Sequence, residues 1–310
     1  MHSPAWLGDA SLVVLSLLVQ GIPFLLLGSL LGAFVSIFAP WGALLRSWPR
    51  HPILSAITGA FFGFMVPACD CAAVPVVRRL VKKGVPLSAA IAYLLAAPEL
   101  NPICLLSTYF AYHLSSPWRM LALRAGGSFV VAVVVGVAAS FISPSRILRA
   151  QVLMGTGEGN EAVPWMEVPP AIGVLRRKAA TILAAGVSDF IDISALYVLG
   201  VLCTAAVQTF LPLGKMVAAK GAFGIPMSMA LAFLLSLCSA ADAFIVNAFG
   251  ILGLAGQLAF LWLGPVYNLR VLFLYRNILR IPAIIGLGIL LIVVIGGQAF
   301  VLAEFKVFAR

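Results

Sequence analysis

Charged residues are scarce in this chain. Of its 310 residues, 10% are charged and 63% are hydrophobic, and the mean hydropathy is +1.11. A soluble domain usually has about 25% charged residues and less than half apolar residues. The scarcity excludes a soluble enzyme, a disordered chain and a disulfide-stapled secreted module. It predicts an all-α, polytopic membrane protein.

Several functional signals are also missing. The sequence has no phosphate-cradling loop, HExxH or Walker motif, so we expect no ATP hydrolysis by this chain, no enzymatic activity and no cofactor. Residues 1–9 contain no Lys or Arg, and we therefore expect no cleavable signal peptide. Cysteine is rare, and every copy falls within an apolar stretch, which argues against a disulfide framework. The five are Cys69, Cys71, Cys104, Cys203 and Cys238.

The charge that is present is mostly positive. Twenty Lys and Arg residues oppose ten Asp and Glu residues, which gives a net charge of +10. In a soluble protein this excess would suggest nucleic acid. In a membrane protein it is typical of cytoplasmic loops, so we expect no nucleic-acid partner.

Apolar runs long enough to span a bilayer, about 20 residues, occur six times. They are Ala10–Ala39, Pro86–Leu114, Met120–Ile142, Ala179–Leu211, Leu254–Tyr275 and Ile281–Ala303. Two further apolar segments, Pro52–Val81 and Ala222–Gly253, are interrupted near their middle. The sequence thus predicts eight apolar segments, of which two are broken or re-entrant.

The polar stretch 143–178 divides the chain into a first membrane half, 1–142, and a second, 179–310. The halves look related, because three rare residue types recur at unchanged spacing after a shift of 167 residues. The pairs are Cys71 and Cys238, Pro98 and Pro265, and Asn101 and Asn268.

Loop charges predict the relative orientation of the halves. If both broken segments are re-entrant hairpins, fourteen cations lie on the linker side and six on the other; if both cross fully, the split is eleven to nine. The positive-inside rule favours the first arrangement, with an inverted repeat and a cytoplasmic linker. In repeat transporters, the substrate site lies at the midplane where broken segments meet.

Acidic residues in apolar segments are the first candidates for function, because each costs about 2.5–3.5 kcal/mol at a helix centre on insertion scales. They suggest a substrate or proton pathway, or else half-helix caps or interfacial groups. Asp189 and Asp192 lie near a basic entry, whereas Asp70 and Asp242 lie at the breaks. Glu99 is the fifth such residue.

The first break contains two thiols, Cys69 and Cys71, which would point about 200° apart on a helix. Pro67 and Pro75 favour the non-helical backbone that would let both thiols face one site. Thiolates bind soft partners, so the two are candidate ligands for a soft metal or a trivalent arsenical. Otherwise they are ordinary buried hydrophobic residues. Cys238 is a further candidate through its repeat relation.

A second kind of break is expected at Pro98-Glu-Leu-Asn-Pro102 and at its counterpart Gly264-Pro-Val-Tyr-Asn268. A proline inside a helix frees a carbonyl about one turn earlier. With Asn101, Asn268 and Glu99, such carbonyls could bind a cation, a proton or a polar substrate. The alternative is a packing kink at Pro98, Pro102 and Pro265.

Two stretches resemble a known family. Val66-Pro-Ala-Cys-Asp-Cys-Ala-Ala-Val-Pro75, with the Pro98–Pro102 motif, and Leu237-Cys-Ser-Ala-Ala-Asp-Ala-Phe244 are similar to the ArsP/YraQ-type permeases. The resemblance implies a bacterial-type inner-membrane permease, and some members of the family export trivalent organoarsenicals. Family members often read Cys-Ser-Cys-Gly, whereas this chain has Asp70 and Ala72.

The sequence therefore predicts a secondary transporter that exports a small thiophilic substrate with ion or proton coupling. A transmembrane thiol–disulfide conduit through Cys71 and Cys238 is one alternative, although Asp70 beside the thiols disfavours the thiolate. A soft-metal permease is another. The expected partners are a small-molecule or metalloid substrate, the lipid bilayer and a second copy of the chain.

Overall fold

The structure is a computed structural model that describes residues 5–38, 48–66, 68–149, 152, 174–210, 224–248 and 253–304. These residues are helical, apart from turns and a single bridge between Leu148 and Leu279. The helices of the first part are α1 (Ala5–Phe38), α3 (Pro52–Met65), α4 (Asp70–Lys82), α5 (Leu87–Glu99), α6 (Pro102–Ala111), α7 (Pro117–Ser140) and α8 (Pro144–Ile147). Those of the second part are α10 (Val174–Phe210), α12 (Gly224–Leu235), α13 (Asp242–Ala248), α14 (Leu254–Leu263), α15 (Leu269–Tyr275) and α16 (Ile281–Glu304).

Five stretches are long and apolar enough to cross a membrane, and the chain is a multi-pass membrane protein. They are Ser11–Phe34, Leu87–Ala111, Pro117–Ser140, Ala179–Thr209 and Ile281–Glu304. Three shorter apolar helices, α3, α12 and α14, accompany them. The expected span Leu254–Tyr275 is not one helix, because the turn at residues 264–268 divides it into α14 and α15.

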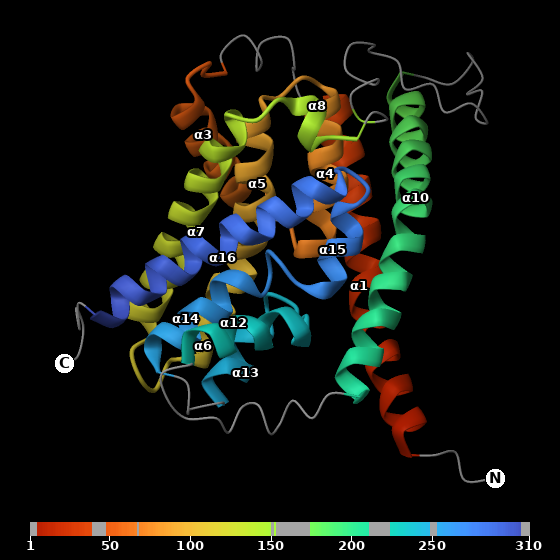
Figure 1. Ribbon diagram of the computed structural model, residues 1–310. Helices are drawn as coiled ribbons and strands as arrows, with labels where there is room; N and C mark the ends of the chain where they lie inside the picture. The colour runs from red at the N-terminus through yellow and green to blue at the C-terminus, as the bar shows by residue number, and fades with distance from the viewer. Residues whose placement is uncertain are drawn as a thin grey trace.

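The two longest helices, α1 and α10, lie side by side and run in opposite directions (Figure 1). In that view α1 rises from the amino terminus at the lower end, and α10 descends from the upper end. The Tyr197 hydroxyl of α10 donates a hydrogen bond of 2.6 Å to the Leu17 carbonyl of α1.

Both broken segments fold as pairs of short helices. At about 1.5 Å per residue, the 14-residue α3 is about 21 Å long, too short for a hydrocarbon core of about 30 Å. Helices α3 and α4 occupy the upper part of Figure 1, whereas α12 and α13 occupy the lower part. After α4 the chain turns at Gly84, whose φ of 91° suits glycine. The break after α12 places buried Ser236 at a φ of 46°.

The two parts of the chain present their helices in the same order. In chain order, α1, α3, α4, α5, α6 and α7 of the first part are matched by α10, α12, α13, α14, α15 and α16 of the second. Equivalent residues also have equivalent roles at two helix starts. The Asn101 side chain caps α6 by accepting from the Ile103 amide at 3.0 Å, and Asn268 caps α15 by accepting from the Val271 amide at 2.9 Å.

Contacts between the two parts are also reciprocal. Helix α4 of the first part packs against α15 of the second, and α13 of the second packs against α6 of the first. Every residue of α5 except Leu87 is buried, and so are residues 258–263 of α14. Because α4 packs against α15 and α13 packs against α6, both α4 and α13 lie where the two parts of the chain meet.

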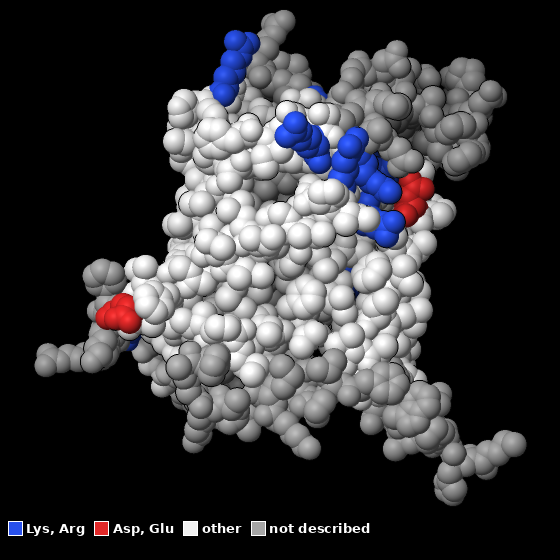
Figure 2. Space-filling model, in the orientation of Figure 1, with Lys and Arg blue, Asp and Glu red and all other residues white. Residues whose placement is uncertain are grey.

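Surface charge is uneven. On the face shown in Figure 2, Lys and Arg side chains gather at the upper end, and most of the remaining surface is uncharged. Among the described cations, Arg50, Lys83, Arg276 and Arg280 lie between helices, Lys82 ends α4 and Arg146 lies on α8. The linker residues 150–151 and 153–173 lie outside the described residues.

Small residues allow α1 to approach α4 closely. A Cβ atom at Gly28 would overlap the Cα and Cβ atoms of Ala72, and one at Gly32 would lie 3.4 Å from the Cα of Val76. The Gly28 and Gly32 pair is therefore a helix-packing surface. The absence of side chains at these two positions lets the first turn of α4 pack directly against α1.

We predict opposite effects for the same substitution at two glycines. Gly28→Ala should lower the free energy of unfolding by about 1–3 kcal/mol, because the new methyl group overlaps Ala72. Gly126→Ala on α7 has open space and should raise it by up to about 1 kcal/mol through helix propensity. Thermal melting of the detergent-purified variants would measure both changes, and equal melting temperatures would contradict the packing.

Candidate functional site

Two arginines lie entirely inside the protein. Arg124 is 0% exposed and Arg270 is 1% exposed. The loop-charge count above included Arg270 among the fourteen linker-side cations and Arg124 among the six on the other side, and both placements in surface loops are wrong. Both lie within apolar runs of the sequence, and that position was the available signal for burial. A buried charge must be paired and hydrogen-bonded, so each arginine marks a buried polar cluster.

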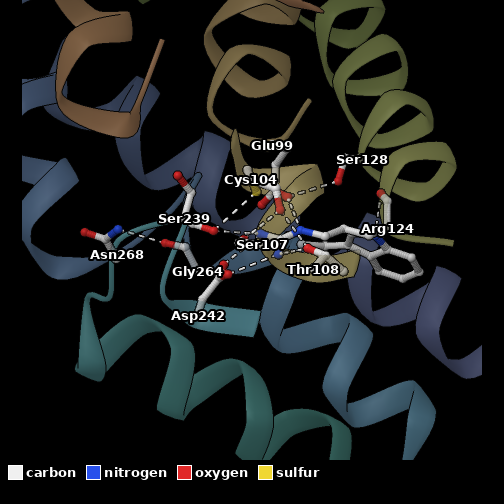
Figure 3. A network of polar contacts seen from close by, with 11 residues as sticks. Glu99, Cys104, Ser107, Thr108, Arg124, Ser128, Ser239, Asp242, Gly264 and Asn268 are labelled. Carbon is white, nitrogen blue, oxygen red and sulfur yellow. Dashed lines mark hydrogen bonds and ion pairs between the residues drawn. The ribbon is translucent and has the colours of Figure 1, made fainter. Parts of the chain in front are cut away.

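Arg124, on α7, is the centre of the first cluster (Figure 3). Its Nη1 and Nη2 atoms donate to the two carboxylate oxygens of Asp242 at 3.0 and 2.8 Å. Nη1 also donates to the Thr108 hydroxyl at 2.8 Å. Such two-point pairing fixes the planar guanidinium in one orientation. Asp242 is the first residue of α13, so Arg124 joins the first part of the chain to the second broken segment.

Glu99, the last residue of α5, shares the same arginine. Its Oε2 atom accepts from Arg124 Nε at 3.1 Å and from the Ser128 hydroxyl at 3.3 Å. Its Oε1 atom is buried and has no hydrogen-bond partner among the described residues. Asp242 therefore has the tighter pairing, and Glu99 keeps an oxygen available for a proton or a cation.

Neighbouring helices hold this cluster in place. The Thr108 hydroxyl donates to the Cys104 carbonyl at 2.8 Å, and the Cys104 thiol donates to the Ser239 carbonyl at 3.2 Å. The Trp262 indole of α14 donates to the Arg124 carbonyl at 3.2 Å. Gly127 makes room for that indole, because a Cβ atom there would overlap the ring.

Arg270, in the first turn of α15, forms the second cluster with Asp70. Asp70 is the first residue of α4 and is 3% exposed. The Arg270 guanidinium carbon lies 6.0 Å from the centre of the Tyr197 ring, a distance typical of a cation–π contact. The Arg270 Nε atom has no hydrogen-bond partner among the described residues. This pair also joins the two parts of the chain. Here the arginine belongs to the second part, whereas Arg124, the arginine of the first cluster, belongs to the first part.

Three cysteines interact electrostatically with this second pair. Cys69 and Cys238 are half-buried, Cys71 is buried, and all three lie within electrostatic range of Asp70. Cys238 is also within electrostatic range of Cys69 and Cys71. Cys69 has extended backbone angles and Cys71 is in the first turn of α4. The thiols of the two breaks are therefore close enough to influence one another electrostatically.

The remaining two cysteines differ from these three. Cys104 is buried in the Arg124 cluster, and Cys203 lies on α10 and is half-buried. All five cysteines of the chain are free thiols. Among the described residues, no group of three or more His, Cys, Asp or Glu side chains is arranged to hold a metal ion.

The asparagines and prolines have local structural roles. Asn101 and Asn268 cap helices, and the buried Asn268 amide also donates to the Gly264 carbonyl at 2.7 Å. Pro75 and Pro98 lie inside α4 and α5, so neither is itself a backbone break. Helical geometry instead ends at Leu100 because Asn101 and Pro102 start a new helix. Pro265 lies in the turn between α14 and α15, and Pro67 lies outside the described residues.

Asp189 and Asp192 form a separate contact between α4 and α10. Arg79 Nε donates to Asp189 at 2.6 Å, and Arg78 Nη1 donates to Asp189 and to Asp192 at 3.3 Å each. Arg79 also donates to the Ala185 carbonyl at 2.9 Å. These contacts attach the end of α4 to α10, so both acids have structural partners.

A cavity of about 290 Å³ lies beside the first cluster. It is lined by Tyr112, Ser115, Ser116, Arg119, Met120, Asn247, Leu254 and Gln257. Tyr112 directly follows α6, which carries Thr108, and Asn247 lies on α13, which begins with Asp242. The Tyr112 hydroxyl donates to the Gln257 side chain at 3.1 Å across this cavity.

The charges of the two clusters do not cancel. Three buried carboxylates, Asp70, Glu99 and Asp242, face two buried guanidinium groups. When all five are ionised, the interior carries one negative charge more than positive charges. Such an interior can accept one proton or one monovalent cation.

A multi-pass bundle with ion-paired groups and broken helices at its centre is typical of membrane transport proteins. The chain belongs to the ArsP_1 family of predicted permeases, which it matches over residues 7–302. It is 32% identical over 262 residues to the UPF0718 protein YcgR of Bacillus subtilis, an alignment that covers 83% of this chain and 84% of YcgR. It is also 29% identical over 299 residues to a Streptococcus mutans protein, and that alignment covers 94% and 95% of the two chains. That protein is named as a candidate subunit of a two-component membrane permease complex. No solved structure matches the chain.

Removing one arginine tests the first cluster. Arg124→Met should destabilise the protein by about 3–5 kcal/mol, because two buried carboxylates lose their counter-ion. Adding Glu99→Gln and Asp242→Asn to that variant should recover much of the loss. Arg276→Met, at an exposed site, should change stability by less than about 0.5 kcal/mol. Thermal melting in detergent measures all three, and a triple variant no more stable than Arg124→Met would contradict the pairing.

Proposed function

We propose that this permease is a secondary transporter for a small thiophilic substrate such as a trivalent organoarsenical, coupled to the movement of a proton or another ion. The convergence of thiols and acids from both broken segments at the junction of the two parts of the chain carries this proposal. The resemblance to organoarsenical exporters also supports it, and export is the direction that it suggests.

Alternating access would come from an inverted repeat. We assign residues 1–142 and 179–310 to two half-repeats joined by the linker 143–178. The opposite directions of α1 and α10, the common helix order and the two asparagine caps support this assignment. In this inverted repeat, α3–α4 and α12–α13 would be re-entrant hairpins that enter the membrane from opposite surfaces. The basic upper loops would then face the cytoplasm of a bacterial-type inner membrane.

Cys69 and Cys71 would bind the thiophilic atom of the substrate, and Cys238 would approach it from the other half. Two thiols give a bond that exchange can reverse, and a transporter must release its cargo. Asp70 holds Arg270 beside the thiols and keeps the cluster neutral. Asn101 and Asn268 would contribute by fixing the starts of α6 and α15.

Glu99, Asp242 and Asp70 are the candidate carriers of the coupling proton. Glu99 has the strongest support, because its Oε1 atom lacks a partner among the described residues. Asp242 engages two nitrogens of Arg124 and would leave that arginine only when the halves separate. The cavity at Tyr112 would give protons or substrate access to this cluster from the side opposite the linker.

A thiol–disulfide conduit is the second candidate function. The electrostatic interaction between Cys71 and Cys238 supports this function, because thiol–disulfide exchange needs the two thiols to approach one another. Trapping a mixed disulfide to a Cys238→Ser variant would support the conduit. A soft-metal permease has less support, since no three-ligand group is present among the described residues.

The partners would be the substrate, the lipid bilayer and another polypeptide. The two-component naming of the streptococcal relative supports a second, different subunit. A homo-oligomer of this chain is the alternative.

We predict that the chain lowers the accumulation of methylarsenite in cells that lack their own arsenic exporters. The variant Cys69→Ser/Cys71→Ser should restore accumulation to that of cells without the transporter, because it has no thiol at the first break. Cys203→Ser, on α10, should leave efflux unchanged. Uptake of labelled methylarsenite checks this, with the protein quantified in membranes. Equal accumulation with and without wild type would rule out this substrate.

A second prediction addresses coupling. In vesicles with an imposed pH gradient, Glu99→Gln should abolish the gradient-driven component of transport, because the amide cannot gain and lose the proton. Asp192→Asn, at an exposed site, should retain that component. If Glu99→Gln, Asp70→Asn and Asp242→Asn all retained gradient-driven transport, proton coupling through these residues would be wrong.

A further inference from the structure

A second cavity, of about 260 Å³, lies away from both clusters, between helices of the two parts of the chain. Helices α5, α7, α8 and α16 contribute its walls. Every lining residue except Arg146 is apolar; the apolar ones are Ile91, Val135, Ala138, Ala139, Ile142, Ile147, Leu279, Pro282, Ala283, Gly286, Leu287 and Leu290. The cavity therefore combines a hydrocarbon-like interior with one cation.

The backbone fixes that cation at the basic end of the protein. Helix α8, which carries Arg146, is joined to the start of α16 by a short bridge. The Arg149 amide donates to the Ile278 carbonyl, and the Arg280 amide donates to the Ile147 carbonyl, each at 2.9 Å. Arg280 Nε also donates to the Leu148 carbonyl at 3.1 Å.

The bridge thereby gathers several positive charges beside the cavity. Arg146, Arg276 and Arg280 are exposed, and Arg149 is partly buried. Within the described part of the chain, no salt bridge joins any of these four arginines to a carboxylate. An anionic ligand group would satisfy them.

We propose that this cavity is a binding site for an anionic phospholipid, with an acyl chain between α7 and α16 and the phosphate on Arg146. The apolar walls exclude a free anion as the complete ligand, and the positive charge at this end of the cavity disfavours a headgroup that carries its own cation. Basic pockets between transmembrane helices at a membrane surface bind anionic headgroups in this way. The lipid would contact both parts of the chain and stabilise their arrangement.

Native mass spectrometry of the purified protein tests the proposal, with phosphatidylglycerol and phosphatidylcholine of identical acyl chains. An arginine near an anionic surface contributes about 1 kcal/mol, which corresponds to roughly fivefold in affinity. Arg146→Gln should weaken phosphatidylglycerol binding by about that factor and weaken phosphatidylcholine binding less, because the choline cation offsets the charge of its phosphate. Arg50→Gln, an exposed cation outside the cavity, is the matched control and should have no effect.

A second variant tests the apolar part of the site. A side chain at Gly286 would enter open space, so Gly286→Leu should fill the cavity without a clash and reduce binding of both lipids. Gly297→Leu, also in open space on α16 but not lining the cavity, should bind as wild type does. Equal affinity for the two lipids would overturn the proposal. So would an equal loss in Arg50→Gln, or displacement of the lipid by inorganic phosphate alone.

Discussion

Two buried arginines constrain the whole structure. Arg124 belongs to the first part of the chain and faces Asp242 of the second, whereas Arg270 belongs to the second part and faces Asp70 of the first. An ion removed from water without a partner costs several kcal/mol. Arg270 pairs with a carboxylate of the other part, and Arg124 pairs with Asp242 of the other part in addition to Glu99 of its own. The burial of both arginines therefore depends on contact between the parts, which holds the starts of α4 and α13 at the junction.

This reciprocal pairing relates the fold to the proposed transport. The acids that hold the arginines are the first residues of α4 and α13, which directly follow the two breaks. The thiols occupy the same breaks, so any movement of one half past the other changes the surroundings of both at once. Glu99 adds a third carboxylate to two arginines, and the resulting excess negative charge makes proton or cation binding compatible with burial.

Much of the fold could be predicted from the sequence, because membrane-spanning helices are visible as long apolar runs. The multi-pass class, the family, the five long spans and the position of both interruptions were all predicted correctly. The run Leu254–Tyr275 has a high mean hydropathy throughout, yet the break expected at Gly264–Asn268 is present and divides the run into α14 and α15. Arg124 and Arg270 were assigned to loops, since their burial depends on carboxylates more than 100 residues away in sequence. Hydropathy describes the lipid-facing surface and does not identify long-range ion pairs.

Double-mutant cycles would measure the coupling energy of the two buried ion pairs that join the parts of the chain. Asp70 and Arg270 form one cycle and Asp242 and Arg124 another, with neutral substitutions and the free energy of unfolding in detergent as the readout. We predict coupling of at least about 1 kcal/mol for both pairs, and smaller coupling for the exchanged pairs Asp70 with Arg124 and Asp242 with Arg270. Equal coupling in all four cycles, or stronger coupling in the exchanged pairs, would contradict the reciprocal arrangement.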